Sequence, residues 1–316
     1  MNQLDVRRIV IFLIVAFGIA WGCALIIYLT GGLVNSPQLI PGTGLTLALV
    51  LLAAVYMWAP ALANIVTRLV TREGWRETLL RPNFRRGWPY WIAGWFGPAV
   101  LTVIGAGLFF VLWPEHFDSG LTRVADLLAQ AGVPAAISPW LIIAGQTLLG
   151  ILIAPLVNGL FTFGEEFGWR GYLQPKLMAV GVRKTFVLMG IIWGVWHWPV
   201  IAMGHNYGLE YPGAPWLGPL AMVWFAFVTG TFLGWLSWRG GSVWPAVIGH
   251  AALNGIANLG VLFAQGQPNP LLGPLPVGLI ASLPWTVLAL WILLSPRALA
   301  GATPQPAVTR LKSAPN

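Results

Sequence analysis

Residues 138–170 have the sequence SPWLIIAGQTLLGILIAPLVNGLFTFGEEFGWR, in which no charged side chain precedes Glu165. A helix needs about 20 mostly apolar residues to cross about 30 Å of hydrocarbon, and this run is long enough to do so. Two acids and Arg170 follow at its end. The stretch predicts a membrane-spanning helix that carries costly ionisable groups, and such groups are functional candidates by default.

The composition of the whole chain also places it in a membrane. Charged residues make up 8% of the 316 residues and hydrophobic residues 57%, whereas soluble domains carry about 25% charged residues. The single cysteine excludes an intramolecular disulfide framework and any multi-cysteine metal site. The net charge of +8 is attributed to membrane topology, so we expect no nucleic-acid partner.

Eight apolar segments are long enough to be spans, so we expect an all-α, polytopic membrane protein. Their approximate ranges are 9–30, 45–67, 88–113, 138–164, 185–204, 216–238, 242–264 and 272–295. Sixteen of the 17 lysines and arginines fall at the termini or in alternate loops, and only Arg123 lies on the other side. By the positive-inside rule, both termini are expected in the cytoplasm. The expected location is the cell (plasma or inner) membrane, with membrane lipids as partners.

The predicted spans divide the chain into four regions. These are an N-terminal three-helix region with a basic cytosolic loop (1–137), a core of spans four to seven (138–265), a last span (266–296) and a disordered cytosolic tail (297–316). A short amphipathic helix is expected around residues 121–130. We expect Pro155, Pro199 and Pro245 to bend their helices, which opens a cavity.

Few ionisable groups lie at membrane depth in this arrangement. They are Glu165, Glu166, Arg170, His197 and His250. Residues four apart share a helix face, so Glu166 can pair with Arg170 while Glu165 faces another side. His250 and Asn254 share a face for the same reason, and two polar groups on an apolar helix must point at something polar.

These residue types can build a hydrolase site. A carboxylate in a desolvated pocket can act as a general base toward water, so Glu165 and His197 are assigned to water activation. His250 and Asn254 can donate hydrogen bonds to a developing oxyanion. Alternatively, Glu165, His197 and His250 bind Zn²⁺ and leave a fourth position open to water. The sequence has no HExxH zinc helix, so the version that needs no cofactor is preferred.

At these residues the sequence resembles the membrane-embedded type II CAAX prenyl endopeptidase family, which includes the Ras-converting enzymes and the bacterial CPBP or Abi proteins. The family patterns EExxxR, FxxxH and HxxxN are matched at Glu165, Glu166, Arg170, His197, His250 and Asn254. One departure is Trp193, which stands where the second pattern has phenylalanine. The resemblance covers about residues 138–265. It implies an intramembrane endopeptidase, with the roles given above for the same side chains.

The leading interpretation is an intramembrane endopeptidase whose cavity opens toward the cytoplasm. Its expected substrate is a hydrophobic or lipid-modified peptide, cut near a membrane-anchored C-terminus. A proton-coupled transporter that uses the same Glu and His groups as a relay stays open. So does a noncatalytic membrane scaffold or bacteriocin-immunity protein. Each motif also has a structural alternative, with Glu165 and Glu166 as a cytosolic loop pair and His250 with Asn254 as interhelical hydrogen-bonding groups.

Overall fold

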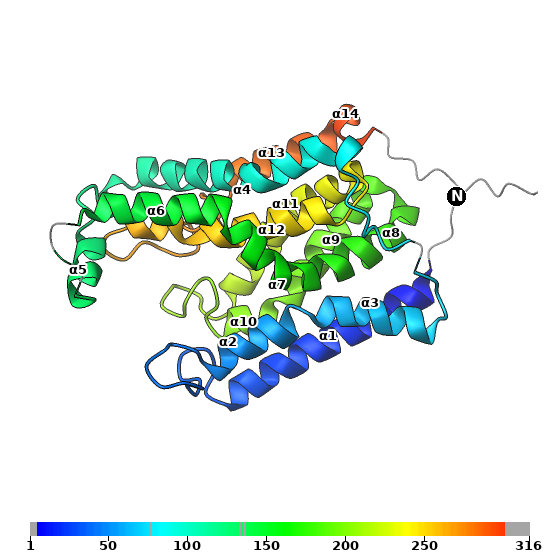
Figure 1. Cartoon of the computed structure of the whole chain (residues 1–316), viewed down its shortest axis with the longest axis horizontal. Coiled ribbons are helices and arrows are strands. Elements are labelled where there is room, and N and C mark those ends of the chain that lie inside the picture. Colours follow the sequence, from blue (N-terminus) through cyan, green and yellow to red (C-terminus); the bar gives the residue numbers. More distant parts are fainter. Residues whose placement is uncertain (1–4, 76, 133, 135–136, 301–316) are drawn as a thin grey trace, which may run out of the picture.

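The computed structural model describes residues 5–75, 77–132, 134 and 137–300, and within them the chain is helical with two isolated β-bridges. This confirms the predicted all-α class (Figure 1). Segments η1 and η3 are π-helical, and η2, η4 and η5 are 3-10 helices. The elements in chain order are α1 (Val6–Leu29), α2 (Leu47–Leu51), η1 (Leu52–Tyr56), α3 (Ala59–Val70), α4 (Phe84–Leu112), η2 (Pro114–His116), α5 (Thr122–Gln130), α6 (Pro139–Leu152), α7 (Ala154–Gly168), η3 (Trp169–Leu173), α8 (Gln174–Leu177), η4 (Met178–Val180), α9 (Val182–Trp196), α10 (Trp198–Ala202), α11 (Leu217–Gly240), α12 (Trp244–Ile256), η5 (Ala257–Phe263), α13 (Leu283–Leu294) and α14 (Pro296–Leu299).

In the described part of the chain, five helices are long and apolar enough to cross a membrane. A sixth is obtained if the bent pair that begins with α6 and continues with α7 counts as one span. The predicted count of eight is therefore not confirmed. The predicted span 185–204 is interrupted at His197, between α9 and α10, and in the predicted span 272–295 the continuous helix is α13, with 12 residues.

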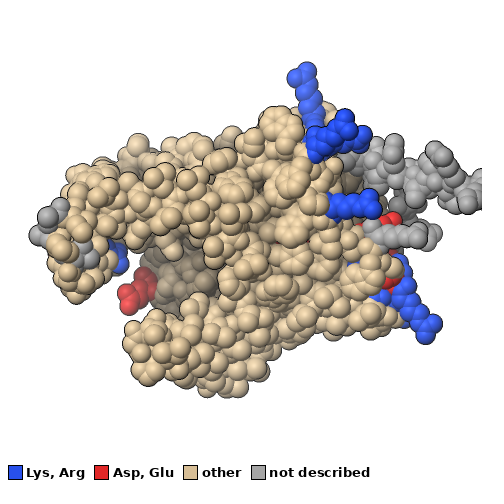
Figure 2. Space-filling view, viewed as in Figure 1, with Lys and Arg blue, Asp and Glu red and all other residues tan. Residues whose placement is uncertain are grey.

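Basic side chains gather at one end of the bundle, which we call the basic end (Figure 2). Arg8 contacts Glu73 there, and Arg239 donates a hydrogen bond to the carbonyl of Arg297. Helices α1, α9 and α12 begin at this end, whereas α3, α11 and α13 end at it (Figure 1). This arrangement agrees with the alternation of basic loops in the sequence. Its assignment to the cytoplasm stays a prediction.

The chain bends by 48° between α6 and α7, as expected from Pro155. Proline has no N–H to donate to the carbonyl of Ile151, four residues earlier, and its ring crowds that carbonyl. Nε1 of Trp95 on α4 donates to the Ile151 oxygen instead, at 2.8 Å. Pro199 lies just after the break between α9 and α10. Pro245 sits in the first turn of α12 rather than at a bend, where a missing N–H costs nothing.

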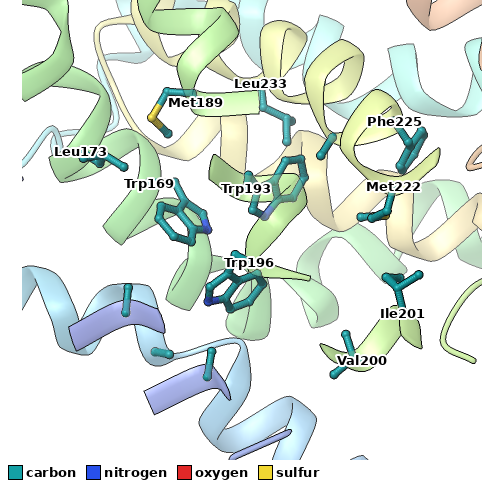
Figure 3. Packing of buried hydrophobic residues seen from close by; sticks show 14 of the residues in the cluster. Trp169, Leu173, Met189, Trp193, Trp196, Val200, Ile201, Met222, Phe225 and Leu233 are labelled. Carbon is teal, nitrogen blue, oxygen red and sulfur yellow. The ribbon is translucent and has the colours of Figure 1, made fainter. Parts of the chain in front are cut away.

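Buried tryptophans fill the core beside α9 (Figure 3). Trp169, Trp193 and Trp196 are each at most 2% exposed, and the ring centroids of Trp169 and Trp196 lie 5.7 Å apart. Helix α9 approaches α11 closely because Gly190 and Gly194 have no side chains. A Cβ on either glycine would lie 2.5 Å from a Cα atom of α11. This close packing holds α9, the helix that carries Trp193, against α11.

Two smaller predictions concern segments outside the bundle. The expected amphipathic helix around residues 121–130 is confirmed as α5, and Asp118 accepts hydrogen bonds from the backbone N–H and the hydroxyl of Thr122. Of the predicted tail, residues 297–299 belong to α14, whereas residues 301–316 lie outside the described residues. Arg76 of the basic loop also lies outside them.

Candidate active site

Two glycines on α7 set the position of the acidic pair. A Cβ on Gly164 would lie 2.6 Å from the carbonyl oxygen of Met57, and one on Gly168 would lie 2.3 Å from the backbone of Pro60. Small residues four apart allow this close approach between membrane helices. Directly after this contact the helix passes into the π-helical turn η3, a type of turn that is frequent at functional sites.

Glu165 lies inside the bundle, with one carboxylate oxygen held in place. The residue is 3% exposed, and its Oε2 accepts a hydrogen bond of 2.8 Å from Nε1 of Trp193. Within the described residues, no hydrogen bond is recorded to Oε1, and the side chain lines a cavity. The alternative that Glu165 and Glu166 form a solvated loop pair is wrong, because both residues are buried in α7.

Glu166 is fully buried and contacts two basic side chains through one oxygen. Its Oε1 accepts a hydrogen bond from Arg170 at 2.9 Å, which confirms the predicted pair. The same oxygen lies 2.9 Å from Nδ1 of His250 on α12. Arg170 is also fully buried and lies 4.8 Å from the ring centroid of Trp193. Because buried charges require partners, this cluster ties α7 and η3 to α12.

His197 occupies the break between α9 and α10 and has a defined tautomer. Its Nδ1 lies 2.7 Å from the backbone carbonyl of Trp193. A carbonyl oxygen only accepts, so Nδ1 must carry the proton and donate it. In the neutral ring, Nε2 is then an acceptor. His197 lines the same cavity as Glu165 and can present this lone pair to a water molecule there.

His250 and Asn254 share one side of α12, as their spacing predicted. Both line the cavity. Because Nδ1 of His250 donates to the Glu166 carboxylate, Nε2 is the ring nitrogen left for the cavity. Asn254 adds an amide that is both donor and acceptor. A different asparagine bridges helices here, since Asn158 of α7 donates to the carbonyl of Ala251 at 3.3 Å.

The cavity has a volume of about 360 Å³ and brings together the four residues predicted to be catalytic. Its lining is Glu165, His197, His250 and Asn254 together with apolar side chains of α2, η1, α11 and α12, among them Leu52, Tyr56, Met222, Phe225 and Leu253. A few polar groups in a mainly apolar pocket are typical of sites that bind and orient a ligand. Glu166 and Arg170 are buried behind the residues that line the cavity.

The cavity extends away from the basic end. Leu49, His205 and Asn206 also line it, at the start of α2 and in the loop before α11. These segments lie at the other end of the bundle (Figure 1), where the space-filling view shows a deep hollow (Figure 2). The sequence predicted an opening at the basic end, whereas the lining of the cavity extends toward the opposite end. Toward the basic end, fully buried side chains such as Trp169 and Arg170 fill the space.

The Zn²⁺ alternative stays a prediction, and the described residues offer it no ready-made group of ligands. In the part of the chain that the structure describes, no group of three or more His, Cys, Asp and Glu side chains is placed to hold a metal ion. His197 and His250 each have Nδ1 engaged by the protein, which leaves Nε2 of both rings and Oε1 of Glu165 for the cavity. The three proposed ligands line one cavity without forming such a group. No step of the chemistry below is assigned to a metal.

Three contacts of the site were not predicted from the sequence. In the sequence pattern, Trp193 is only an aromatic replacement for phenylalanine. In the structure, its indole N–H donates a hydrogen bond to Glu165. Tyr56 donates to the carbonyl of Trp196 at 2.5 Å and lines the cavity. Asn64 of α3 donates to the carbonyl of Phe167, just after the acidic pair. The sequence offered one signal for these contacts, which is that the indole N–H of Trp193 lies one helical turn before His197.

The fold and the site define a multi-pass helical membrane protein with buried Glu and His side chains around one cavity. Residues 143–256 match the family described as type II CAAX prenyl endopeptidase Rce1-like. This segment holds all six motif residues, so the chain is similar to that family where the candidate site lies.

One curated relative is similar over a shorter stretch. CAAX prenyl protease 2 of Methanococcus maripaludis is 40% identical over 47 residues, which are 15% of this chain and 17% of the relative. The match thus spans about a sixth of that protein's length. These similarities support a membrane-embedded peptidase.

Proposed function

We propose that the chain is an intramembrane endopeptidase that hydrolyses a peptide bond near a membrane-anchored, hydrophobic or lipid-modified C-terminus. The observation that carries the proposal is the placement of Glu165. One of its oxygens is held by Trp193, and the side chain lines a cavity shared with His197, His250 and Asn254. Residues 138–265 act as the catalytic core, flanked by the N-terminal region 1–137 and the last span 266–296.

In the proposed reaction, Glu165 and Nε2 of His197 bind the attacking water. Glu165 takes a proton from the water as its oxygen adds to the carbonyl carbon of the peptide. The amide of Asn254 donates to the resulting oxyanion, and His250 donates from Nε2 when its ring carries both protons. The carboxyl group of Glu165 then gives its proton to the leaving nitrogen as the C–N bond breaks. The products are a carboxylic acid and an amine, and proton exchange between them gives the carboxylate and the ammonium.

Glu166 and Arg170 support this chemistry without touching the substrate. The Glu166 carboxylate accepts from Nδ1 of His250 and so directs Nε2 away from itself. Arg170 balances the charge of Glu166. Catalytic groups held by a second layer of contacts keep the geometry that a reaction requires.

The proposed membrane topology determines which side of the membrane the cavity faces. With the basic end in the cytoplasm of a cell membrane, both termini are cytoplasmic. The loop of residues 203–216 and the hollow beside it then face the opposite side. A substrate reaches Glu165 from that side or through the surrounding lipid. The substrate's own anchor lies in the bilayer beside the apolar wall of the cavity.

Cleavage by the purified protein in lipid vesicles tests the proposal. The probes are fluorescent peptides with either a prenylated or an unmodified apolar C-terminal segment. We expect Glu165→Gln to lower kcat by about 100-fold or more, because general base catalysis contributes about 10²–10⁴. The control is Glu115→Gln, an exposed position at the end of the bundle opposite the basic end, and it should keep the parent rate. The parent rate should also survive chelation of divalent metals.

Two outcomes would overturn the proposal. One is a parent protein that cuts none of the peptides but moves protons across the vesicle membrane, as the transporter interpretation requires. The other is a Glu165→Gln variant that cuts as fast as the parent. Loss of the parent activity on chelation, with recovery on adding Zn²⁺, would replace the metal-free mechanism with the zinc alternative.

A further inference from the structure

Trp193 contacts both residues that are proposed to activate water. Its indole N–H donates to Oε2 of Glu165, and its backbone carbonyl accepts from Nδ1 of His197. Its ring also packs edge-on against the rings of His197 and His250, with centroids 5.4 Å and 5.3 Å away. Three of the polar residues that line the cavity, Glu165, His197 and His250, therefore contact one aromatic residue.

The surroundings of Trp193 hold its ring in one orientation. The guanidinium of Arg170 lies 4.8 Å from the ring centroid, a distance at which cation–π attraction is effective. On another side, a Cβ built on Gly230 would lie 3.5 Å from Cε3 of the ring, so the indole packs against a glycine of α11. A side chain that is 2% exposed and packed in this way has little freedom to rotate.

We propose that Trp193 is the positioning residue of the site. Its N–H fixes Oε2 of Glu165, so that Oε1 is presented to the water and the substrate in the cavity. The catalytic consequence rests on the function proposed above, whereas the hydrogen bond itself can be tested without any activity. The hydrogen bond to His197 comes from the backbone carbonyl, so a change of the Trp193 side chain keeps that bond and removes the one to Glu165.

The chain offers a matched control for the loss of an indole N–H. Trp285 on α13 is 1% exposed, like Trp193, but its Nε1 has no hydrogen-bond partner among the described residues. Trp193→Phe and Trp285→Phe therefore remove similar buried aromatic area. Trp193→Phe alone removes a hydrogen bond to the carboxyl group of Glu165.

Infrared difference spectroscopy and kinetics together test the proposal. The chain has only nine acids, so the spectrum of the parent minus that of Glu165→Gln isolates the carboxyl band of Glu165. We expect this band to shift in Trp193→Phe and to stay in place in Trp285→Phe. We also expect kcat of Trp193→Phe to fall about tenfold or more, because a hydrogen bond to a charged group has about this effect on a rate. KM should stay within about twofold of the parent value.

Each outcome decides the role of Trp193. A Glu165 band that is unchanged in Trp193→Phe, or that shifts equally in both variants, overturns the proposal. So does a kcat within about twofold of the parent, or a fall in kcat that Trp285→Phe reproduces. A parent without peptidase activity contradicts the proposed function, and the infrared comparison then decides the positioning role alone. If Trp193→Phe does not fold, β-(3-benzothienyl)alanine at position 193 keeps the shape of the indole and replaces its N–H by sulfur.

Discussion

Nδ1 of His250 lies 2.9 Å from Oε1 of Glu166, the oxygen that also accepts a hydrogen bond from Arg170. The two neighbouring acids therefore have different surroundings. Glu166 is fully buried between two basic groups, whereas Glu165 contacts an indole N–H and lines the cavity. The chemistry is assigned to Glu165 for this reason, and Glu166 is assigned to holding His250.

Removal of the Glu166 carboxylate is expected to destabilise the fold strongly. Glu166→Ala leaves the buried Arg170 without its partner, and breaking a buried ion pair in this way costs about 3–5 kcal/mol. Thermal unfolding in detergent should show a large fall in Tm. Glu165→Gln keeps the ion pair and should unfold close to the parent. A Glu166→Ala variant as stable as the parent would show that the pair contributes nothing.

A methyl group at Gly168 is expected to disrupt the packing of α7 on α3. A Cβ there would lie 2.3 Å from the backbone of Pro60, so the helices must separate, at a cost of about 1–3 kcal/mol. Gly159→Ala on the same helix is the control, because its Cβ would meet only Val247 Cγ1 at 3.9 Å. That change should be neutral or stabilise the helix by up to about 1 kcal/mol. Equal unfolding temperatures for the two variants would contradict this account.

Local spacing predicted some features of the site, and packing determined the others. Glu166 and Arg170 are four positions apart, as are His250 and Asn254, so the pair and the shared face follow from helix geometry. The contact between Glu166 and His250 joins residues 84 positions apart. It depends on how α7 and α12 meet, and no local pattern contains that information.

The direction of the cavity shows a second limit of the sequence. Hydropathy identifies apolar segments, and basic loops give their alternation. Pro199 itself predicted the break after α9, but neither hydropathy nor the basic loops predict that large side chains such as Trp169 fill the basic end. The count of eight spans is not confirmed for a related reason, because segments such as α13 are apolar but too short to cross as continuous helices.

Glu73 is the meeting point of three cations at the basic end. Nε of Arg8 and NH1 of Arg68 lie 3.3 Å and 3.8 Å from its carboxylate oxygens, and Lys176 and Tyr172 donate hydrogen bonds to them. Burial by itself raises the pKa of Glu73, but the hydrogen bonds from Lys176 and Tyr172 and the nearby cations outweigh it. The pKa is therefore lowered from its ordinary value of 4.5.

The lowered pKa predicts acid sensitivity. A carboxylate whose native pKa lies below its unfolded value stabilises the fold fully above about pH 4.5, and this stability is lost as the pH falls through the native value. We expect Tm of the parent to fall more steeply below pH 4.5 than Tm of Glu73→Gln. Glu115→Gln should keep the steep dependence of the parent. If Tm of the parent and Tm of Glu73→Gln fall in parallel as the pH is lowered, this cluster has no role in acid stability.

Labelling of single cysteines is expected to place the cavity opening on the non-cytoplasmic side. The natural Cys23 is buried at 1% exposure, so it should react little with a membrane-impermeant maleimide. Glu210→Cys lies in the exposed loop beside the hollow, and Lys184→Cys is exposed at the basic end. In intact cells, only Glu210→Cys should be labelled. Lys184→Cys should require permeabilised cells, because basic loops are retained in the cytoplasm.

The reverse labelling pattern would contradict the predicted topology and turn the cavity toward the cytoplasm. Asn206→Cys, which replaces a lining residue of the cavity, extends the test to the site itself. It should react from the same side as Glu210→Cys, and a substrate peptide in excess should slow its reaction. Protection at Asn206→Cys without protection at Glu210→Cys would show that the peptide enters through this opening. Unchanged rates at both positions would instead favour entry through the lipid.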